Sequence, residues 1–146
     1  TDRMTSDRII LVTGGGGYVG SVLVPELLRL GESVRVVDTF WFDHQLPAHP
    51  RLELITGDIR TADPAWVDGV SAVIHLAGLS NDPTADFAPA LNAESNVLAT
   101  RNLAEIVARK AQNEKREIRF LFASSCSINR FVAPTGSICS PLPECA

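Results

Sequence analysis

The sequence predicts an α/β fold in which helices cover both faces of a doubly wound parallel sheet, with strand order 3-2-1-4-5. Three observations predict this fold class. Short apolar runs alternate with segments of helical periodicity, four consecutive glycines follow the first run, and an aspartate ends the second. Strands that alternate with helices at this spacing favour parallel pairing. The right-handed crossover rule then leaves few topologies.

The first elements are a strand, a helix and a second strand. Ile9–Thr13 (IILVT) is a short apolar run, which indicates a buried parallel strand. Residues 18–30 are expected to form a helix, which Gly31 is placed to end. Its apolar residues at helical spacing are Val19, Val22, Leu23, Leu27 and Leu30. Ser33–Asp38 (SVRVVD) is the second strand.

The remaining elements continue the alternation. Leu52–Thr56 and residues 72–76 are expected to be the third and fourth strands, and Asp63-Pro64 between them favours the start of a short helix. A long helix is expected over about residues 89–112, followed by a fifth buried strand over residues 118–123. The residues expected on the inner face of the long helix are Val97, Leu103, Ile106 and Val107.

Composition favours one globular domain. The 146 residues are 45% hydrophobic and 21% charged, and the formal net charge is −4. No basic stripe suggests nucleic-acid binding, and no apolar run has the length of a membrane span. The polar N-terminus does not resemble a signal peptide, and three cysteines without a C-x-x-C pair favour the cytoplasm. We expect a binding domain over residues 1–125 and an atypical tail over residues 126–146.

The glycine-rich segment after the first strand predicts a dinucleotide site of the Rossmann type. Gly14 allows a sharp turn, Gly17 allows the backbone to approach a pyrophosphate, and Gly20 allows the helix to pack closely on the sheet. The helix N-terminus offers free N–H groups to phosphates. A tight turn that merely needs glycine is the alternative. A P-loop NTPase is disfavoured because no lysine follows Gly20.

Asp38 favours NAD as the cofactor. It ends the second strand at about the distance from the glycine loop, roughly 20 residues, that the dinucleotide fingerprint requires. A carboxylate there accepts hydrogen bonds from ribose hydroxyls and repels a 2′-phosphate. Thr39 and its neighbours supply no arginine, so an NADP-dependent reductase is disfavoured. The alternative is an exposed aspartate that caps a loop.

The order of motifs resembles the first half of an extended short-chain dehydrogenase/reductase, most of all its NAD-dependent nucleotide-sugar epimerase/dehydratase branch. The match runs from about residue 9 to residue 127. Besides the glycine loop and Asp38, the segments that carry it are Gly57-Asp58-Ile59-Arg60, His75-Leu76-Ala77-Gly78, Asn96-Val97 with Thr100, and Phe122-Ala123-Ser124-Ser125.

The resemblance implies roles for individual residues. Asp58 would contact the adenine, with Ile59 packing on it, and Asn96 would brace the central helix. Ser125 would orient the substrate as the one catalytic-site residue. The residues implied at the cofactor are Gly14, Gly17, Tyr18, Val19, Gly20, Asp38, Thr39, Asp58, Ile59, Leu76, Ala77, Gly78, Asn96 and Ser124. No metal site is implied.

Structural roles are the alternatives for the same residues. Asp58 is also consistent with a turn acid, and Asn96 with a purely structural amide. His75 is interpreted as a histidine at the edge of the core rather than as an acid–base group. Ser124 and Ser125 are also suited to satisfying backbone groups at a strand end.

The catalytic Tyr-x-x-x-Lys pair of the family that the sequence resembles is absent. The only tyrosine is Tyr18, and the last lysine, Lys115, precedes the fifth strand. We therefore expect a chain truncated before the catalytic helix and catalytically incomplete. Residues 126–146 contain all three cysteines, which also departs from the family pattern. Three origins are open: an expression or proteolytic fragment, a frameshift or early stop, which best explains the change in composition, or a natural short paralogue.

The expected function is the NAD-binding domain of a protein that resembles a nucleotide-sugar epimerase/dehydratase. A nucleotide sugar would be a substrate only if the missing half were supplied. The alternatives are a non-catalytic NAD-binding or subunit-interaction module and an inactive truncated product. A homo-oligomer is expected, because a central helix without its packing neighbour would expose apolar surface.

Overall fold

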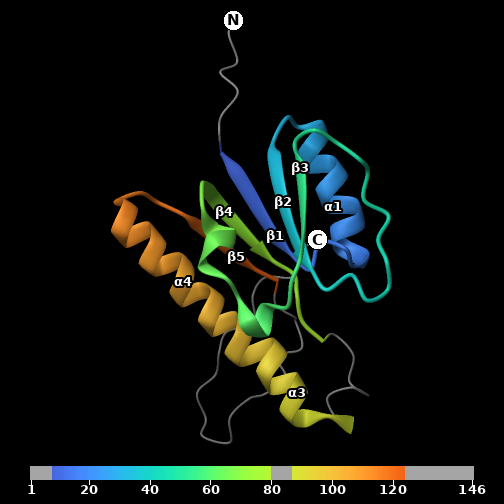
Figure 1. The fold of residues 1–146 in the computed structure, drawn as a ribbon, viewed down its shortest axis with the longest axis vertical. Helices are drawn as coiled ribbons and strands as arrows, with labels where there is room; N and C mark the ends of the chain where they lie inside the picture. Colours follow the sequence, from blue (N-terminus) through green and yellow to red (C-terminus); the bar gives the residue numbers. More distant parts are fainter. Residues whose placement is uncertain (1–7, 80–86, 124–146) are drawn as a thin grey trace, which may run out of the picture.

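A five-stranded parallel sheet forms the centre of the fold in the computed structural model, which describes residues 8–79 and 87–123 (Figure 1). Its strands are β1 (Ile9–Thr13), β2 (Ser33–Asp38), β3 (Leu52–Thr56), β4 (Val70–His75) and β5 (Arg119–Phe122). Their order is β3-β2-β1-β4-β5, and every neighbouring pair is parallel. The predicted doubly wound topology is confirmed. The predicted tail, residues 126–146, lies outside the described residues.

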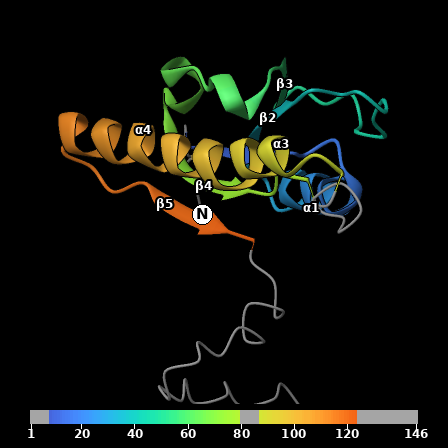
Figure 2. The same ribbon diagram turned by 90° about the horizontal axis from the view of Figure 1, so that it is seen from below.

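Helices connect the strands. They are α1 (Tyr18–Arg29), the 3-10 helices η1 (Ile59–Thr61) and η2 (Pro64–Val67), and the consecutive segments α3 (Pro89–Ala93), η3 (Glu94–Leu98) and α4 (Ala99–Glu114). The last three form one long rod along the sheet, of which η3 is a π-helical turn (Figure 2). Lys115 ends this rod with a left-handed backbone, φ 50°.

Two apolar layers hold the helices against the sheet. One layer packs α4 and η2 on β1, β2 and β4, and its buried members are Leu11, Val37, Trp66, Val67, Val70, Val73, Leu103, Ile106 and Val107. The other packs α1 on β1 and β2, and its buried members are Val12, Val24, Leu28, Val34, Val36 and Leu46. Successive strand residues point to opposite faces, so Leu11 and Val12 enter different layers.

The buried face of α1 differs from the one that apolar spacing suggested. Gly20, Val24 and Leu28 face the sheet, whereas Val22 and Leu30 are exposed. A Cβ on Gly20 would lie 2.2 Å from the Gly15 carbonyl oxygen. The helix therefore sits closest to the sheet at Gly20, and this contact fixes which face turns inward.

The prediction that Val97 lies on the inner face was wrong. Its side chain lies on η3 and is 61% exposed, although Leu103, Ile106 and Val107 are buried as expected. A π-helical turn contains more residues than an α-helical turn. The α-helical spacing that placed Leu103 correctly therefore misplaces a residue on η3.

The fifth strand is confirmed, but the prediction that it is buried was wrong. Leu121 and Phe122 are about half exposed. Among the described strands β5 is at the edge and pairs only with β4. The apolar run of this strand resembles that of a central one, and only the pairing distinguishes them.

Candidate dinucleotide-binding site

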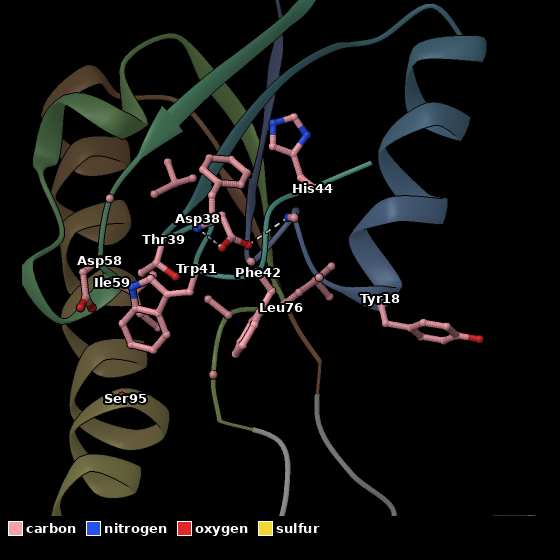
Figure 3. Close-up of a pocket in the computed structure, with 18 of the residues that line it drawn as sticks. Tyr18, Asp38, Thr39, Trp41, Phe42, His44, Asp58, Ile59, Leu76 and Ser95 are labelled. Atoms are coloured by element: carbon pink, nitrogen blue, oxygen red, sulfur yellow. Dashed lines mark hydrogen bonds between the residues drawn. The ribbon is translucent and has the colours of Figure 1, made fainter. Parts of the chain in front are cut away.

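A cavity of about 770 Å³ lies at the carboxyl ends of β1, β2 and β4. The strand order reverses between β1 and β4, and ligands of such sheets bind outside the strand ends at this switch point. The cavity size is in the range of small-molecule and cofactor sites. It is lined by the loop after β1 with the start of α1, by the end of β2 with the loop that follows it, by residues 57–60, by residues 76–79 and by Ser95 of η3 (Figure 3).

The glycine loop forms one wall and needs glycine for measurable reasons. Gly14 has φ +73°, and a Cβ there would lie 2.6 Å from the Ala77 backbone nitrogen. The loop after β1 therefore touches the residue that follows β4 by two positions. Gly17 is the N-cap of α1 and makes no side-chain capping bond, so the first turn of the helix keeps N–H groups for a ligand.

Asp38 ties the second strand to the glycine loop. One of its carboxylate oxygens accepts a hydrogen bond from the Gly16 N–H at 2.9 Å, and the other accepts one from the Phe40 N–H at 2.8 Å. Each oxygen has a further lone pair, so both can still accept a hydroxyl. The Asp38 side chain is thus held in one orientation at the cavity wall before any ligand binds.

Asp58 lines the cavity and also caps η1. Its carboxylate accepts a hydrogen bond from the Arg60 backbone N–H at 2.9 Å and several from the Arg60 guanidinium, the shortest at 2.6 Å. The side-chain hydrogen bond from Arg60 lowers the pKa of Asp58, against a smaller opposing effect of burial. The carboxylate is therefore ionised at neutral pH. Asp58 is a helix-capping acid in this fold, and its contact with a cofactor stays a prediction.

The loop after β4 is held by Asn96 on η3. The Asn96 amide oxygen accepts from the Leu79 N–H at 2.7 Å, and its amide nitrogen donates to the Leu79 carbonyl at 2.8 Å. A Cβ on Gly78 would lie 2.6 Å from the same amide oxygen. Asn96 therefore braces the loop that lines the cavity, and is not itself part of the lining.

His75 is a core histidine rather than a cavity residue. Its side chain is 1% exposed, with Nδ1 2.6 Å from the Thr13 hydroxyl and Nε2 2.8 Å from the Thr100 hydroxyl. Burial lowers its pKa. The interpretation of His75 as a structural histidine agrees with this placement.

Most of the residues predicted at the cofactor come together around the cavity. Those that line it are Gly14, Gly17, Tyr18, Asp38, Thr39, Asp58, Ile59, Leu76, Ala77 and Gly78. Three others do not, because Gly20 packs against Gly15, Val19 is exposed and Asn96 acts through Leu79. Ser124 and Ser125 lie outside the described residues.

Tyr18 is a special case among these residues. It is part of the glycine-loop wall, but its ring is 90% exposed and points away from the cavity (Figure 3). Only its backbone is therefore placed to meet a ligand.

Sequence reasoning missed part of the lining. The lining residues that it did not name as site residues are Gly16, Ser21, Val37, Phe40, Trp41, Phe42, Asp43, His44, Gln45, Gly57, Arg60, Leu79 and Ser95. Gly16 was detectable, since the loop has four consecutive glycines and only two of them were assigned. The aromatic run Phe40-Trp41-Phe42 also carried a signal, because it directly follows the acidic strand end.

Two other kinds of site are not found in the described part of the chain. Within residues 8–79 and 87–123, no helix is long and apolar enough to cross a membrane. The same residues contain no group of three or more side chains that could hold a metal ion.

Comparisons with known proteins identify the family of the chain. Residues 10–135 match the NAD dependent epimerase/dehydratase family. A UDP-glucuronic acid decarboxylase 1 of Arabidopsis thaliana is 32% identical over 82% of this chain and 26% of its own length. A 3 beta-hydroxysteroid dehydrogenase/Delta 5-->4-isomerase of Mycobacterium tuberculosis (strain ATCC 25618 / H37Rv) is 47% identical over 48% of this chain and 19% of its own.

Solved structures also resemble the fold. A UDP-N-acetylglucosamine 4-epimerase from Methanobrevibacter ruminantium M1 has a TM-score of 0.74 at 26% identity, covering 96% of this chain and 43% of that one. MoeE5 in complex with UDP-glucuronic acid and NAD has a TM-score of 0.70 at 32% identity, covering 82% and 38%. This chain spans less than half the length of these proteins. It belongs to the NAD-dependent epimerase/dehydratase family and represents the Rossmann-fold part of it.

Proposed function

We propose that this chain binds NAD in the cavity at the carboxyl ends of β1, β2 and β4. The observation that carries the proposal is the bond between the Asp38 carboxylate and the Gly16 N–H, because it joins the two parts of a dinucleotide site before a ligand is present. The free lone pairs of Asp38 suit two neighbouring ribose hydroxyls, and its charge would repel a 2′-phosphate. The start of α1 suits the pyrophosphate.

The glycine cradle fits the same ligand. The nearest atom that a Cβ on Gly17 would meet is 3.3 Å away, so the side of Gly17 towards the cavity is open to a pyrophosphate. The small residues Ala77 and Gly78 line the cavity next to Gly14, and the nicotinamide ribose would lie against them. Bound NAD supplies a hydride acceptor. The residues of this chain bind and orient the cofactor.

We further propose that the protein acts in a pathway of nucleotide-linked sugars, and that the 146 residues alone do not turn over a substrate. Three of the similar proteins that cover more than two thirds of this chain are a UDP-glucuronic acid decarboxylase, a UDP-N-acetylglucosamine 4-epimerase and MoeE5, whose structure contains UDP-glucuronic acid and NAD. The family's Tyr-x-x-x-Lys pair is absent from the sequence. Ser125 would orient the sugar hydroxyl if the pair were supplied by further chain.

A second substrate class is favoured by one observation. The hydroxysteroid dehydrogenase is 47% identical, more than the UDP-sugar enzymes, although over only 72 residues. Oxidation of a steroid hydroxyl requires the same hydride acceptor as oxidation of a sugar hydroxyl. The cofactor site therefore does not distinguish between the two substrate classes. A non-catalytic NAD-binding module is the remaining alternative, and saturable NAD binding without turnover of either substrate class supports it.

Self-association in the cytoplasm completes the proposal. The exposed apolar side chains at the N-terminal end of the long helical rod are Val97 and Leu98 on η3 and Phe87, which precedes α3. A second copy of this chain is the proposed partner for this surface. Sedimentation velocity at micromolar concentration is the test, and a clean monomer would refute the homo-oligomer.

The test of the cofactor is isothermal titration of the 146-residue chain with NAD and with NADP. We expect micromolar affinity for NAD and at least about tenfold weaker affinity for NADP. Asp38→Asn should weaken NAD binding about tenfold or more and reduce the discrimination between the two. Asp68→Asn is the matched control, since Asp68 pairs with Lys110 away from the cavity lining. Absence of binding, or equal affinity for both dinucleotides, would refute the proposal.

A further inference from the structure

Two exposed aromatic side chains line the cavity directly after β2. Trp41 is 65% exposed and Phe42 is 95% exposed, yet both belong to the cavity wall. Large apolar side chains exposed side by side in a binding cavity indicate a surface that a ligand covers. Neither residue is used by the pyrophosphate and ribose contacts assigned to the glycine loop and Asp38.

The turn that carries these two rings is fixed. The Asp43 N–H donates to the Phe40 carbonyl at 3.2 Å, which closes a turn with Trp41 and Phe42 at its two central positions. Phe40 and Asp43 on either side have φ of 51° and 63°, a conformation that residues other than glycine rarely adopt. Such strained backbone persists where the surroundings impose it, and it clusters at ligand-binding sites.

The surroundings that impose this turn include Asp38. The Phe40 N–H donates to the Asp38 carboxylate, and the Phe40 ring packs against His44 with ring centroids 4.9 Å apart. On its other side the ring closes over the glycine loop, because a Cβ on Gly16 would lie 2.9 Å from it. The carboxylate proposed to hold the ribose therefore also positions the turn that presents Trp41.

The neighbours of Trp41 in the cavity suit a flat heterocycle. Figure 3 shows the indole on the side of Asp58 and Ile59, while Phe42 lies towards Leu76. Ile59 is buried beneath the surface, and the Asp58–Arg60 pair supplies hydrogen-bonding groups at the edge. Apolar faces with polar groups at the rim are what a nucleobase needs, because its faces are apolar and its edges are polar.

We propose that the Trp41 indole stacks on the adenine of the bound dinucleotide and contributes to its affinity. The inference rests on the proposed NAD binding. The adenine is joined to the ribose whose hydroxyls would bind Asp38, and Trp41 follows Asp38 by three positions on a turn bonded to that carboxylate. A base held at this ribose therefore lies within reach of the indole. Stacking of a base on an aromatic ring requires no further group.

Tryptophan fluorescence tests directly whether the Trp41 indole contacts the adenine, because the chain has only two tryptophans. Trp66 is buried against Gly57, whereas Trp41 is largely exposed. We expect ADP-ribose and AMP to quench the solvent-exposed emission in a saturable manner, and nicotinamide mononucleotide to leave it unchanged. Trp41→Phe should abolish this quenching and keep NAD affinity within about threefold of wild type, since phenylalanine also stacks.

Affinity provides the second measurement. Trp41→Ala should weaken NAD and ADP-ribose about tenfold, the size of effect seen when a stacking aromatic is removed. Leu30→Ala is the matched control, because Leu30 is also a largely exposed apolar residue (57%) and lies outside the cavity lining. The thermal midpoint of each variant should stay near that of wild type.

Three results would overturn the inference in distinguishable ways. If wild type binds NAD and the affinity of Trp41→Ala stays within twofold of it, the stacking is refuted and the proposed function remains. Absence of NAD binding by wild type would refute both. Quenching by nicotinamide mononucleotide as strong as by ADP-ribose would place the indole at the wrong end of the dinucleotide and would also refute the stacking.

Discussion

Asn96 holds both backbone polar groups of Leu79, accepting from its N–H at 2.7 Å and donating to its carbonyl at 2.8 Å. The two residues come from different elements, η3 and the loop after β4, so the side chain substitutes for a backbone ladder where the strand has ended. We expect Asn96→Ala to lower the free energy of unfolding by about 1–3 kcal/mol, because both Leu79 groups lose their partner. Asn113→Ala, on the exposed end of α4, should change it by less than about 0.5 kcal/mol in urea denaturation.

Gly78 supplies a sharper test of the same contact. A Cβ there would lie 2.6 Å from the Asn96 amide oxygen, so Gly78→Ala should displace the amide and cost about as much as Asn96→Ala. In the Asn96→Ala background the extra methyl group meets no amide and should cost little. The double-mutant cycle should therefore show a coupling of about 1–2 kcal/mol. Additive effects of the two substitutions would contradict the contact.

Gly17 and Gly20 should respond differently to alanine. At Gly20 a Cβ would lie 2.2 Å from the Gly15 carbonyl oxygen, and backbone cannot yield there without moving α1 away from the sheet. We expect Gly20→Ala to lower the free energy of unfolding by about 3 kcal/mol. At Gly17 the nearest atom is 3.3 Å away and the backbone is extended, so the loss should stay within about 1 kcal/mol.

Gly17→Ala, the less destabilising of the two substitutions, should have the larger effect on NAD affinity. The Gly17→Ala methyl group lies at a residue that lines the cavity, where the pyrophosphate is proposed. We expect it to weaken NAD binding about tenfold or more in isothermal titration while the fold persists. Retention of wild-type NAD affinity by Gly17→Ala would argue against the proposed pyrophosphate position.

The strands were predictable because each is a short apolar run closed by a turn signal. β1, β2 and β3 begin and end at the predicted residues, and β4 and β5 differ by one or two. Such runs occur because both faces of a parallel sheet are covered, so the pattern has little ambiguity. Their order followed from the crossover rule rather than from any single residue.

The helix faces were harder, because close backbone contacts leave no trace in apolar spacing. Val22 and Leu30 fit the helical period and are exposed, since the contact of Gly20 with Gly15 sets the rotation of α1. Val97 is exposed because η3 is a π turn, which the sequence pattern did not indicate. In both cases local geometry outweighed hydrophobic periodicity.

The candidate site was predictable where one residue type suits one task. Gly14 and Asp38 were expected for turn geometry and ribose binding, and both line the cavity. Trp41 was missed because its exposure depends on the turn between Phe40 and Asp43, which the sequence pattern did not indicate. The bond from Gly16 to Asp38 depends on tertiary placement and cannot be derived from spacing.

Arg35 on β2 connects three segments and should not tolerate lysine. Its guanidinium donates to the carbonyls of Trp66 and Asp68 at 2.8 and 2.9 Å and to the Glu53 carboxylate at 2.6 Å. A lysine ammonium lacks this planar fork and cannot reach all three in one geometry. We expect Arg35→Lys to lower the free energy of unfolding by about 1–2 kcal/mol.

Arg29→Lys on α1 provides the matched control for Arg35→Lys. Arg29 is exposed and pairs only with Glu26 among the described residues, so its replacement should change stability by less than about 0.5 kcal/mol. Equal losses for the two variants in chemical denaturation would contradict the connecting role of Arg35.

The hydrogen bonds of His75 fix its tautomer as well as its place. The Thr100 hydroxyl donates to the Asn96 carbonyl at 2.9 Å, so it accepts from the His75 Nε2–H. Nδ1 is then the acceptor for the Thr13 hydroxyl. The faces of the ring meet Phe120 and Phe122, with centroids 6.0 and 5.9 Å away. None of these contacts supplies a carboxylate, so nothing among them stabilises the protonated ring.

Stability should therefore fall as the solution becomes mildly acidic. Burial lowers the pKa of His75 below its ordinary value of 6.5, so the unfolded chain binds this proton more readily than the folded one. The neutral ring contributes its full stability above about pH 6.5, and the contribution is lost as the pH falls below that value. The loss can reach about 1.4 kcal/mol per pH unit. The carboxylates with lowered pKa, such as Asp58, titrate below their ordinary range and do not contribute in this window.

Urea denaturation at pH 7.5 and 5.5 measures this effect, with His75→Gln as the variant. Glutamine keeps one donor and one acceptor but cannot gain a proton, so the fall in unfolding free energy between the two pH values should shrink. His49→Gln, at a part-exposed loop residue, is the control and should retain the wild-type fall. If the unfolding free energy of His75→Gln falls as much as that of wild type, another group causes the acid sensitivity. Burial between the two threonines would then not disfavour protonation of His75.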